Sequence, residues 1–124
     1  MKIDIQSGIP IYLQITEQIK LSVLSGRYRS GDRLPSVREL AVGLRINPNT
    51  VVKAYQMLKD EGITDSRPGG GNFVLAQEGG DMTAQSEDII MKEFQAVIDK
   101  AGMLNVSKER INKLFQKILS ERKG

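Results

Sequence analysis

The sequence predicts a mainly α-helical chain with one small β-hairpin and two additional helices at the C-terminal end. Apolar residues recur at helical spacing in five separate stretches. Near residue 70 the spacing changes to that of short strands around a glycine-rich turn. A polar, glycine-containing segment follows. We therefore divide the chain of 124 residues into 1–75, a linker at 76–86 and a helical tail at 87–124.

The first two helices are indicated by their apolar spacing and their ends. One is expected at 10–25 and ends at Gly26. Its apolar row consists of Ile11, Ile15, Ile19 and Val23. After a loop with two glycines, the segment from Ser36 to Glu39 has the form of a capping box, so a short helix is expected at 37–44.

The stretch INPNTVVKAYQML, residues 46–58, begins a third helix abruptly. Asn47 can cap its N-terminus, and Pro48 suits the first helical position because its missing N–H costs nothing there. The apolar face consists of Val51, Ala54, Tyr55 and Leu58. We therefore expect Tyr55 to lie in the core rather than to stack on a nucleotide base.

Two short strands, 63–66 and 72–75, are predicted around the turn RPGGG. The glycines of this turn lack the Lys-Ser/Thr pair and the following helix that a phosphate-binding loop needs, so a hairpin tip is the better interpretation. In the tail, apolar stripes predict helices at 87–103 and 108–122, with Ser107 as the N-cap of the second.

The composition excludes several classes of function. The chain has neither Cys nor His, which argues against an ordinary transition-metal site and against imidazole-dependent catalysis. No carboxylate pair is placed for acid–base work. We expect no enzymatic activity, no metal and no cofactor. No stretch has the form of a signal peptide or a membrane span, so we expect a cytoplasmic protein without membrane contact.

The positive charge is confined to one half of the chain. Residues 1–75 carry ten basic and seven acidic residues, whereas residues 76–124 carry eight of each. A basic patch restricted to one part favours a polyanionic partner for that part. The order of elements there is helix, short helix, tight turn, helix and hairpin, which is that of a winged helix-turn-helix. In such a fold the third helix enters the major groove of DNA.

The segments LPSVRELAVGLRINPNTVVKAYQMLKDEGI and RPGGGNFV resemble the DNA-binding domain of GntR-family transcriptional regulators. The similarity is close over residues 9–75, and the short helical tail resembles the YtrA-like branch of the family. The resemblance implies that Ser36 contacts a phosphate. It also implies DNA contacts by Arg38, Asn47, Asn49, Thr50, Lys53, Gly69 and Gly70.

The residues themselves support part of this site. Asn49 and Thr50 would be equally suitable as plain first-turn residues, but Lys53 and the hairpin favour DNA contact. Asn can pair with adenine through two hydrogen bonds, and Thr can touch a thymine methyl or a phosphate. Arg67 at the hairpin is a further expected contact. Arg33 has a weaker claim because exposed arginines are usually only solvated.

The chain departs from the family pattern in two places. Other branches often carry Arg in the first turn of the third helix, where this chain has Pro48 and Asn49, so their base preferences should not be transferred. The family also usually has an apolar residue at the position of Thr64, which predicts a looser first strand of the hairpin.

The apolar stripe of the first tail helix could pack wholly within its own subunit. Because two isolated short helices bury little surface, however, the tail is expected to pair two copies of the chain. The predicted dimerisation residues are Ile90, Phe94, Val97, Ala101, Ile111, Leu114, Phe115 and Ile118. These observations predict a homodimeric repressor that binds a two-fold operator in double-stranded DNA. The alternatives are a small-molecule sensor with a site near the tail helices, and a winged helix used only for protein contacts. The sequence identifies no effector.

Overall fold

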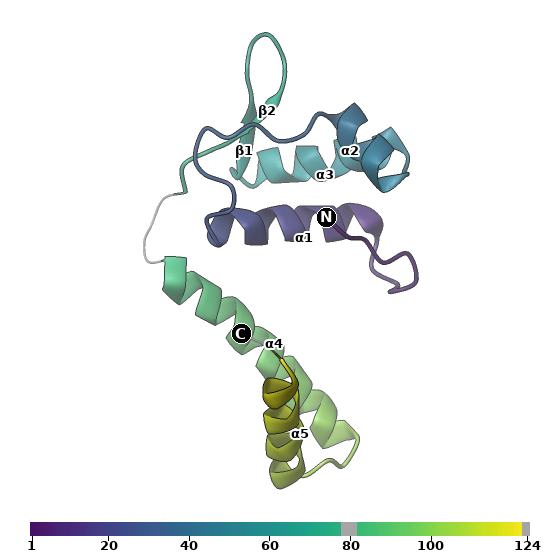
Figure 1. The fold of residues 1–124 in the computed structure, drawn as a ribbon, viewed down its shortest axis with the longest axis vertical. Coiled ribbons are helices and arrows are strands. Elements are labelled where there is room, and N and C mark those ends of the chain that lie inside the picture. Colours follow the sequence, from purple (N-terminus) through teal and green to yellow (C-terminus); the bar gives the residue numbers. More distant parts are fainter. Residues whose placement is uncertain (78–81, 123–124) are drawn as a thin grey trace. The chain divides into compact units, whose positions relative to one another are not determined.

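The computed structural model describes residues 1–77 and 82–122. Their arrangement confirms the expected fold class (Figure 1). The elements in chain order are α1 (Ile11–Leu24), α2 (Val37–Leu44), α3 (Pro48–Asp60), β1 (Thr64–Ser66), β2 (Asn72–Val74), α4 (Met82–Met103) and α5 (Lys108–Glu121). The chain divides into two compact units, Met1–Met82 and Thr83–Gly124, which we call the head and the tail.

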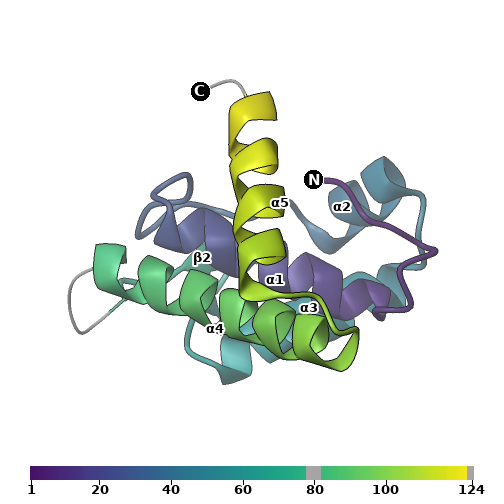
Figure 2. The same cartoon turned by 90° about the horizontal axis from the view of Figure 1, so that it is seen from below.

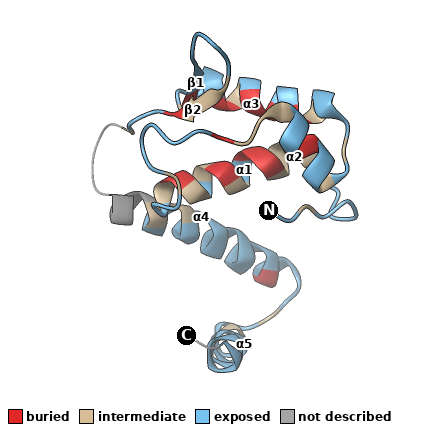
Figure 3. Cartoon of the chain, turned by 45° about the horizontal axis from the view of Figure 1, so that its top comes forward, coloured by how far each residue is buried: buried red, intermediate tan, exposed pale blue. Residues whose placement is uncertain are grey.

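The head has one closed hydrophobic core formed by α1, α2, α3 and β2 (Figure 3). Its largest fully buried side chains are Ile15, Ile19, Leu34, Leu58, Val51, Val74 and Thr64. α1 contributes the row predicted from its spacing, and it ends before Gly26, which adopts a positive φ of 83°. Helix α3 therefore packs against α1 with one face and leaves the opposite face to solvent.

The helix-turn-helix follows from local capping chemistry. The capping box predicted at the start of α2 is present, with Ser36 and Glu39 exchanging hydrogen bonds. The turn after α2 uses Arg45 in the left-handed conformation, with φ 57° and ψ 49°. Because a non-glycine residue adopts this conformation at some cost, the packing of α2 on α3 must favour the sharp turn.

The hairpin is antiparallel, and Thr64 pairs with Val74 while Ser66 pairs with Asn72. The loop before α2 adds a third line of hydrogen bonds to β2. Val74 N–H donates to the Asp32 carbonyl at 2.8 Å, and Leu34 N–H donates to the Asn72 carbonyl at 2.8 Å. The hairpin is thus anchored at its base, while its loop projects from the side of α3 away from α1 (Figure 1).

The tail contains α4 and α5, joined by a short turn that includes Asn105 at a φ of 59°. Ser107 caps α5 as expected, accepting a hydrogen bond from Arg110 N–H at 3.1 Å. The start of α4 differs from the prediction: the helix begins at Met82, so the second half of the predicted 76–86 linker is helical. Residues 81–86 contain neither Gly nor Pro. Their polar composition alone therefore did not mark where the helix begins.

Candidate DNA-binding surface

The N-terminus of α3 is fixed by its cap. Asn47 Oδ1 accepts a hydrogen bond from Asn49 N–H at 2.9 Å, and Pro48 occupies the first helical position. Both features agree with the sequence prediction. The cap uses the acceptor oxygen of Asn47, so the amide group that remains for DNA is a donor, which suits a phosphate oxygen.

The first exposed turns of α3 present Asn49, Thr50 and Lys53. Asn49 and Lys53 are exposed and Thr50 is half-buried. The Lys53 ammonium lies 4.0 Å from the centre of the Tyr12 ring of α1. A cation over an aromatic face is attracted to it, so Tyr12 limits the positions that this long side chain samples. Lys53 is therefore oriented before any partner arrives.

The start of α2 carries Ser36 and Arg38. The Ser36 hydroxyl oxygen accepts from Glu39 N–H at 3.0 Å, and the Glu39 carboxylate accepts from Ser36 N–H at 3.2 Å. These hydrogen bonds with Ser36 are the main reason that the pKa of Glu39 lies below its usual value, and the charge of Arg33 adds to the effect. Because the Ser36 hydroxyl already interacts with the Glu39 carboxylate, it can donate to a phosphate only by leaving that contact. Arg38 is exposed in the same turn.

One buried hydrogen bond connects α3 to the segment before α2. The Tyr55 hydroxyl donates to the Pro35 carbonyl at 2.6 Å, and Tyr55 is only 4% exposed. Burial raises the pKa of the Tyr55 phenol, so it stays a donor. Tyr55 is thus a core residue, as its spacing predicted, and it fixes where Ser36 lies relative to the third helix.

The hairpin loop supplies Arg67, Gly69 and Gly70. Gly69, Gly70 and Gly71 have φ values of 91°, 102° and 100°, a conformation that favours glycine. The Arg67 guanidinium lies 4.1 Å from the centre of the Phe73 ring. The loop is therefore a narrow turn in which Pro68 is followed by three glycines, with a cation at its base.

The predicted DNA-contacting residues all lie in the head, on α2, on α3 with its cap, and on the hairpin loop. Sequence reasoning missed two aromatic residues, Tyr12 and Phe73, that orient Lys53 and Arg67. The only sequence signal for either was its place in an apolar pattern, which does not reveal a cation partner distant along the chain.

The tail has an extensive exposed apolar surface. Ile90 is 51% exposed, Val97 57% and Ile118 57%, and no described residue of α5 is buried. Phe94 and Phe115 contact each other edge to face, with ring centres 5.8 Å apart, so part of the predicted seam joins α4 to α5 within one chain. The other members are Leu114, which is exposed, and Ile111, which is half-buried.

Ala101 differs from the other predicted dimerisation residues. It is only 8% exposed within its own chain. The turn after α4 folds back at this position, where Val106 N–H donates to the Ala101 carbonyl at 2.9 Å. Ala101 therefore belongs to the inside of the tail rather than to its exposed face.

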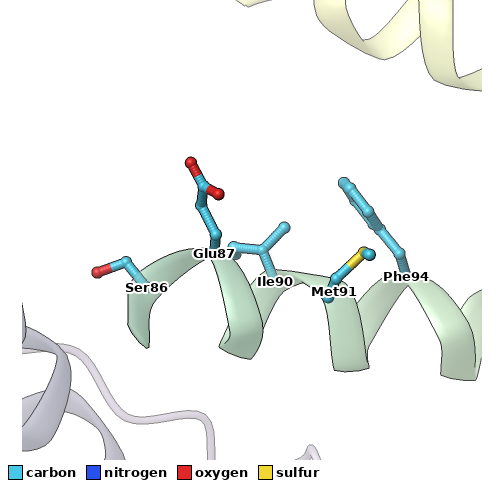
Figure 4. A pocket seen from close by; sticks show the side chains of 5 residues that line it. All are labelled: Ser86, Glu87, Ile90, Met91 and Phe94. Carbon is cyan, nitrogen blue, oxygen red and sulfur yellow. The ribbon is translucent and has the colours of Figure 1, made fainter. Parts of the chain in front are cut away.

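A shallow hollow of about 420 Å³ lies along α4 (Figure 4). Its lining consists of Ser86, Glu87, Ile90, Met91 and Phe94. All five come from one helix, and few of the lining atoms are polar, so the hollow is part of the exposed apolar face of α4. In the described residues no helix is long and apolar enough to cross a membrane. The same part of the chain holds no cluster of three or more potential metal ligands.

The fold agrees with that of known proteins. The model of the gntR family of bacterial regulatory proteins matches residues 11–74. The chain is 36% identical to the HTH-type transcriptional repressor YtrA of Bacillus subtilis (strain 168), over 100% of this chain and 95% of that protein. The chain therefore belongs to the GntR family, whose members are regulators of transcription rather than enzymes.

Two solved structures support the assignment. A GntR family transcriptional regulator from Listeria monocytogenes has a TM-score of 0.71 and 33% identity, covering 90% of this chain and 97% of that one. The DNA-binding domain of AraR in complex with operator ORX1 has a TM-score of 0.53 and 28% identity, covering 60% of this chain and 92% of that one. The protein is thus a transcriptional regulator with a winged helix-turn-helix DNA-binding domain.

Proposed function

We propose that the protein is a homodimeric repressor that acts in the cytoplasm by binding a two-fold operator. The observation that carries the proposal is the fixed N-terminus of α3, where Asn49 and Lys53 are exposed and Thr50 is half-buried beside a capped helix start. Asn49 is suited to read a base edge, and Lys53 to neutralise a phosphate. The AraR complex supports DNA as the partner, and the repressor YtrA supports the direction of regulation.

The second copy is proposed because the tail leaves large apolar side chains exposed. Ile90, Val97 and Ile118 are each more than half exposed, so the described residues of one chain leave them largely uncovered. Monomeric proteins rarely expose contiguous apolar patches of this kind. A two-fold pairing of tails would place two heads on one duplex, since dimeric helix-turn-helix proteins bind two half-sites.

Selection of bound duplexes from a random DNA pool tests both parts. The expected result is a consensus with two inverted half-sites. A consensus with a single half-site would contradict the dimeric part. Failure to enrich any sequence over the starting pool would overturn the proposal of sequence-specific binding. A reporter gene placed behind the selected sequence then measures the direction of regulation, which we expect to be repression.

A further inference from the structure

Arg33 is fixed to the hairpin although it lies outside it in the sequence. Its backbone forms a bridge with Phe73, and the neighbouring Leu34 N–H donates to the Asn72 carbonyl at 2.8 Å. Asp32 also accepts from Val74 N–H, so hydrogen bonds hold the chain on both sides of Arg33. The side chain of Arg33 therefore starts from a rigid point beside the hairpin.

Phe73 is linked to both Arg33 and Arg67, to Arg33 through the backbone bridge and to Arg67 through its ring. The Arg67 guanidinium lies 4.1 Å from the centre of the ring. A Cβ placed on Gly71 would be 3.0 Å from Arg33 Nε and 3.1 Å from Phe73 Cε2. The Arg33 side chain thus crosses directly over Gly71 next to the ring, and any residue larger than glycine at position 71 would have to displace one of the two.

The two guanidinium groups lack a carboxylate partner in the described part of the chain. Within residues 1–77 and 82–122, neither forms an ion pair with a carboxylate, whereas the nearby Asp65 carboxylate lies 4.0 Å from Lys59 Nζ. The Glu39 carboxylate is close enough for the charge of Arg33 to lower its pKa, but no ion pair joins the two groups. Two cations held at one hairpin repel each other unless an anionic partner is present. This arrangement is therefore suited to a site of strongly negative potential.

The shape of the hairpin tip indicates which kind of negatively charged site it fits. Gly69, Gly70 and Gly71 carry no side chains, so Pro68 is the one residue with a side chain between Arg67 and Asn72. A minor groove is about 6 Å wide, and A·T-rich sequences narrow it and strengthen its negative potential, which attracts arginine. A thin tip with two arginines at its base fits this groove better than it fits an open phosphate surface.

We propose that Arg33 and Arg67, held by Phe73, form an arginine pair that enters the minor groove beside each half-site and selects A·T-rich flanks. This inference rests on the proposed DNA-binding function and adds a second, specificity-determining contact to it. Arg33 is the member of this pair that lies outside the hairpin in the sequence.

The test compares three versions of the selected duplex in a fluorescence anisotropy titration. They carry A·T, G·C or inosine·C pairs at the flanking positions. Inosine·C resembles G·C in the major groove but lacks the 2-amino group, so its minor groove resembles that of A·T. We expect the full-length protein to bind the G·C version about fivefold more weakly, at the low end of the cost of one unfavourable base pair. Inosine·C should restore the affinity.

Arg33→Ala should remove this discrimination, so that the A·T and G·C versions bind equally. Arg27→Ala is the matched control, because it removes the same charge from an exposed position in the loop after α1. The control should keep the full preference. Equal preferences in the Arg33 and Arg27 variants would overturn the role of Arg33, and so would a wild-type protein that binds all three duplexes equally.

Arg33→Lys separates groove recognition from charge alone. Lysine keeps the charge but not the planar guanidinium of Arg33. We expect this variant to lose the A·T preference while the dependence of affinity on salt stays unchanged. A retained preference would mean that any cation suffices and would contradict the arginine pair. If the random pool yields no selected duplex, the proposed function fails and this inference fails with it. If a duplex is selected but the wild-type protein shows no A·T preference, only this inference fails.

Discussion

Asn49 is the residue at which base recognition is most directly testable. Its backbone N–H is held by the cap, so truncating its side chain leaves the helix start intact. We expect Asn49→Ala to cost about 1–3 kcal/mol of binding free energy at one base pair in each half-site. Titration of the operator and its single-base variants would measure this.

Pro48→Ala is the control for this measurement, since it changes the same turn without touching a base-reading group. It should leave the preferred sequence unchanged. A uniform loss of affinity by Asn49→Ala on every duplex would show that Asn49 contacts a phosphate instead of a base.

Thr64 is a second residue with a measurable consequence. Its side chain is only 1% exposed, and its hydroxyl has no hydrogen-bond partner among the described residues. Valine has nearly the same shape without the polar group, so Thr64→Val should raise the free energy of unfolding by about 1 kcal/mol. Urea unfolding followed by circular dichroism would detect the change.

Thr16→Val is the matched control for the measurement on Thr64. Thr16 is 2% exposed, but its hydroxyl donates to the Tyr12 carbonyl at 2.8 Å. Because this buried hydroxyl is satisfied, its removal should bring no gain in stability. An equal gain from both substitutions would mean that the orphaned hydroxyl of Thr64 is not the cause.

Single residues also show the limit of sequence reasoning. The roles of Asn47, Pro48 and Ser36 were predictable because capping depends on neighbours a few positions away. The contact of Lys53 with Tyr12 and the place of Arg33 beside Phe73 were not predictable. Each depends on how distant segments pack, and a pattern along the chain carries no such information.

At the scale of elements, α2 provides a prediction about pH. Hydrogen bonding to the Ser36 side chain, and secondly to the Ser36 backbone N–H, lowers the pKa of Glu39 below the usual 4.5 in the folded protein. The folded state therefore binds this proton less readily than the unfolded state. The contribution of the carboxylate to stability is present above pH 4.5 and is lost as the pH falls through the folded-state pKa.

Comparison with Glu39→Gln isolates this contribution, because glutamine can keep the capping box but carries no charge. The difference in unfolding free energy between the two proteins should shrink as the pH falls below 4.5. In the background Ser36→Ala the same difference should depend less on pH, because only the backbone N–H at position 36 then remains to lower the pKa of Glu39. A difference that stays constant with pH in both backgrounds would contradict the proposed linkage.

Element boundaries were predictable where chemistry marks them. The bounds of α2 matched because a capping box begins it, and α3 ends before Gly62, which adopts a φ of 76°. The start of α4 was placed too late because no strong breaker lies between Met82 and the apolar stripe. Polar helix formers and polar linker residues overlap in composition, so composition alone did not separate them.

At the scale of the whole molecule, the pairing of tails is the main prediction. Val97 is 57% exposed, whereas Phe94 in the same helix is partly covered by its contact with Phe115. If a second copy covers Val97, Val97→Asp would bury an unpaired charge and weaken the dimer by several kcal/mol, about the cost of such burial. Sedimentation equilibrium would then show a monomer.

Val42→Asp is the control, since it places the same charge at a 71% exposed apolar position in the head. This variant should sediment like the wild type. A Val97→Asp protein that remains a dimer would exclude this face of α4 as the interface. The spacing of apolar residues could predict an apolar surface on the tail, but it could not predict that Phe94 contacts Phe115 within one chain.

The closed core of the head has a consequence for how such proteins diversify. All of its fully buried side chains come from residues 15–74, so its interior does not depend on the residues after the hairpin. A gene encoding this head can be fused to a different downstream segment without any change to the buried residues. The two parts of the chain can therefore evolve at separate rates, the head constrained by its interior and by DNA, and the tail by its own partner.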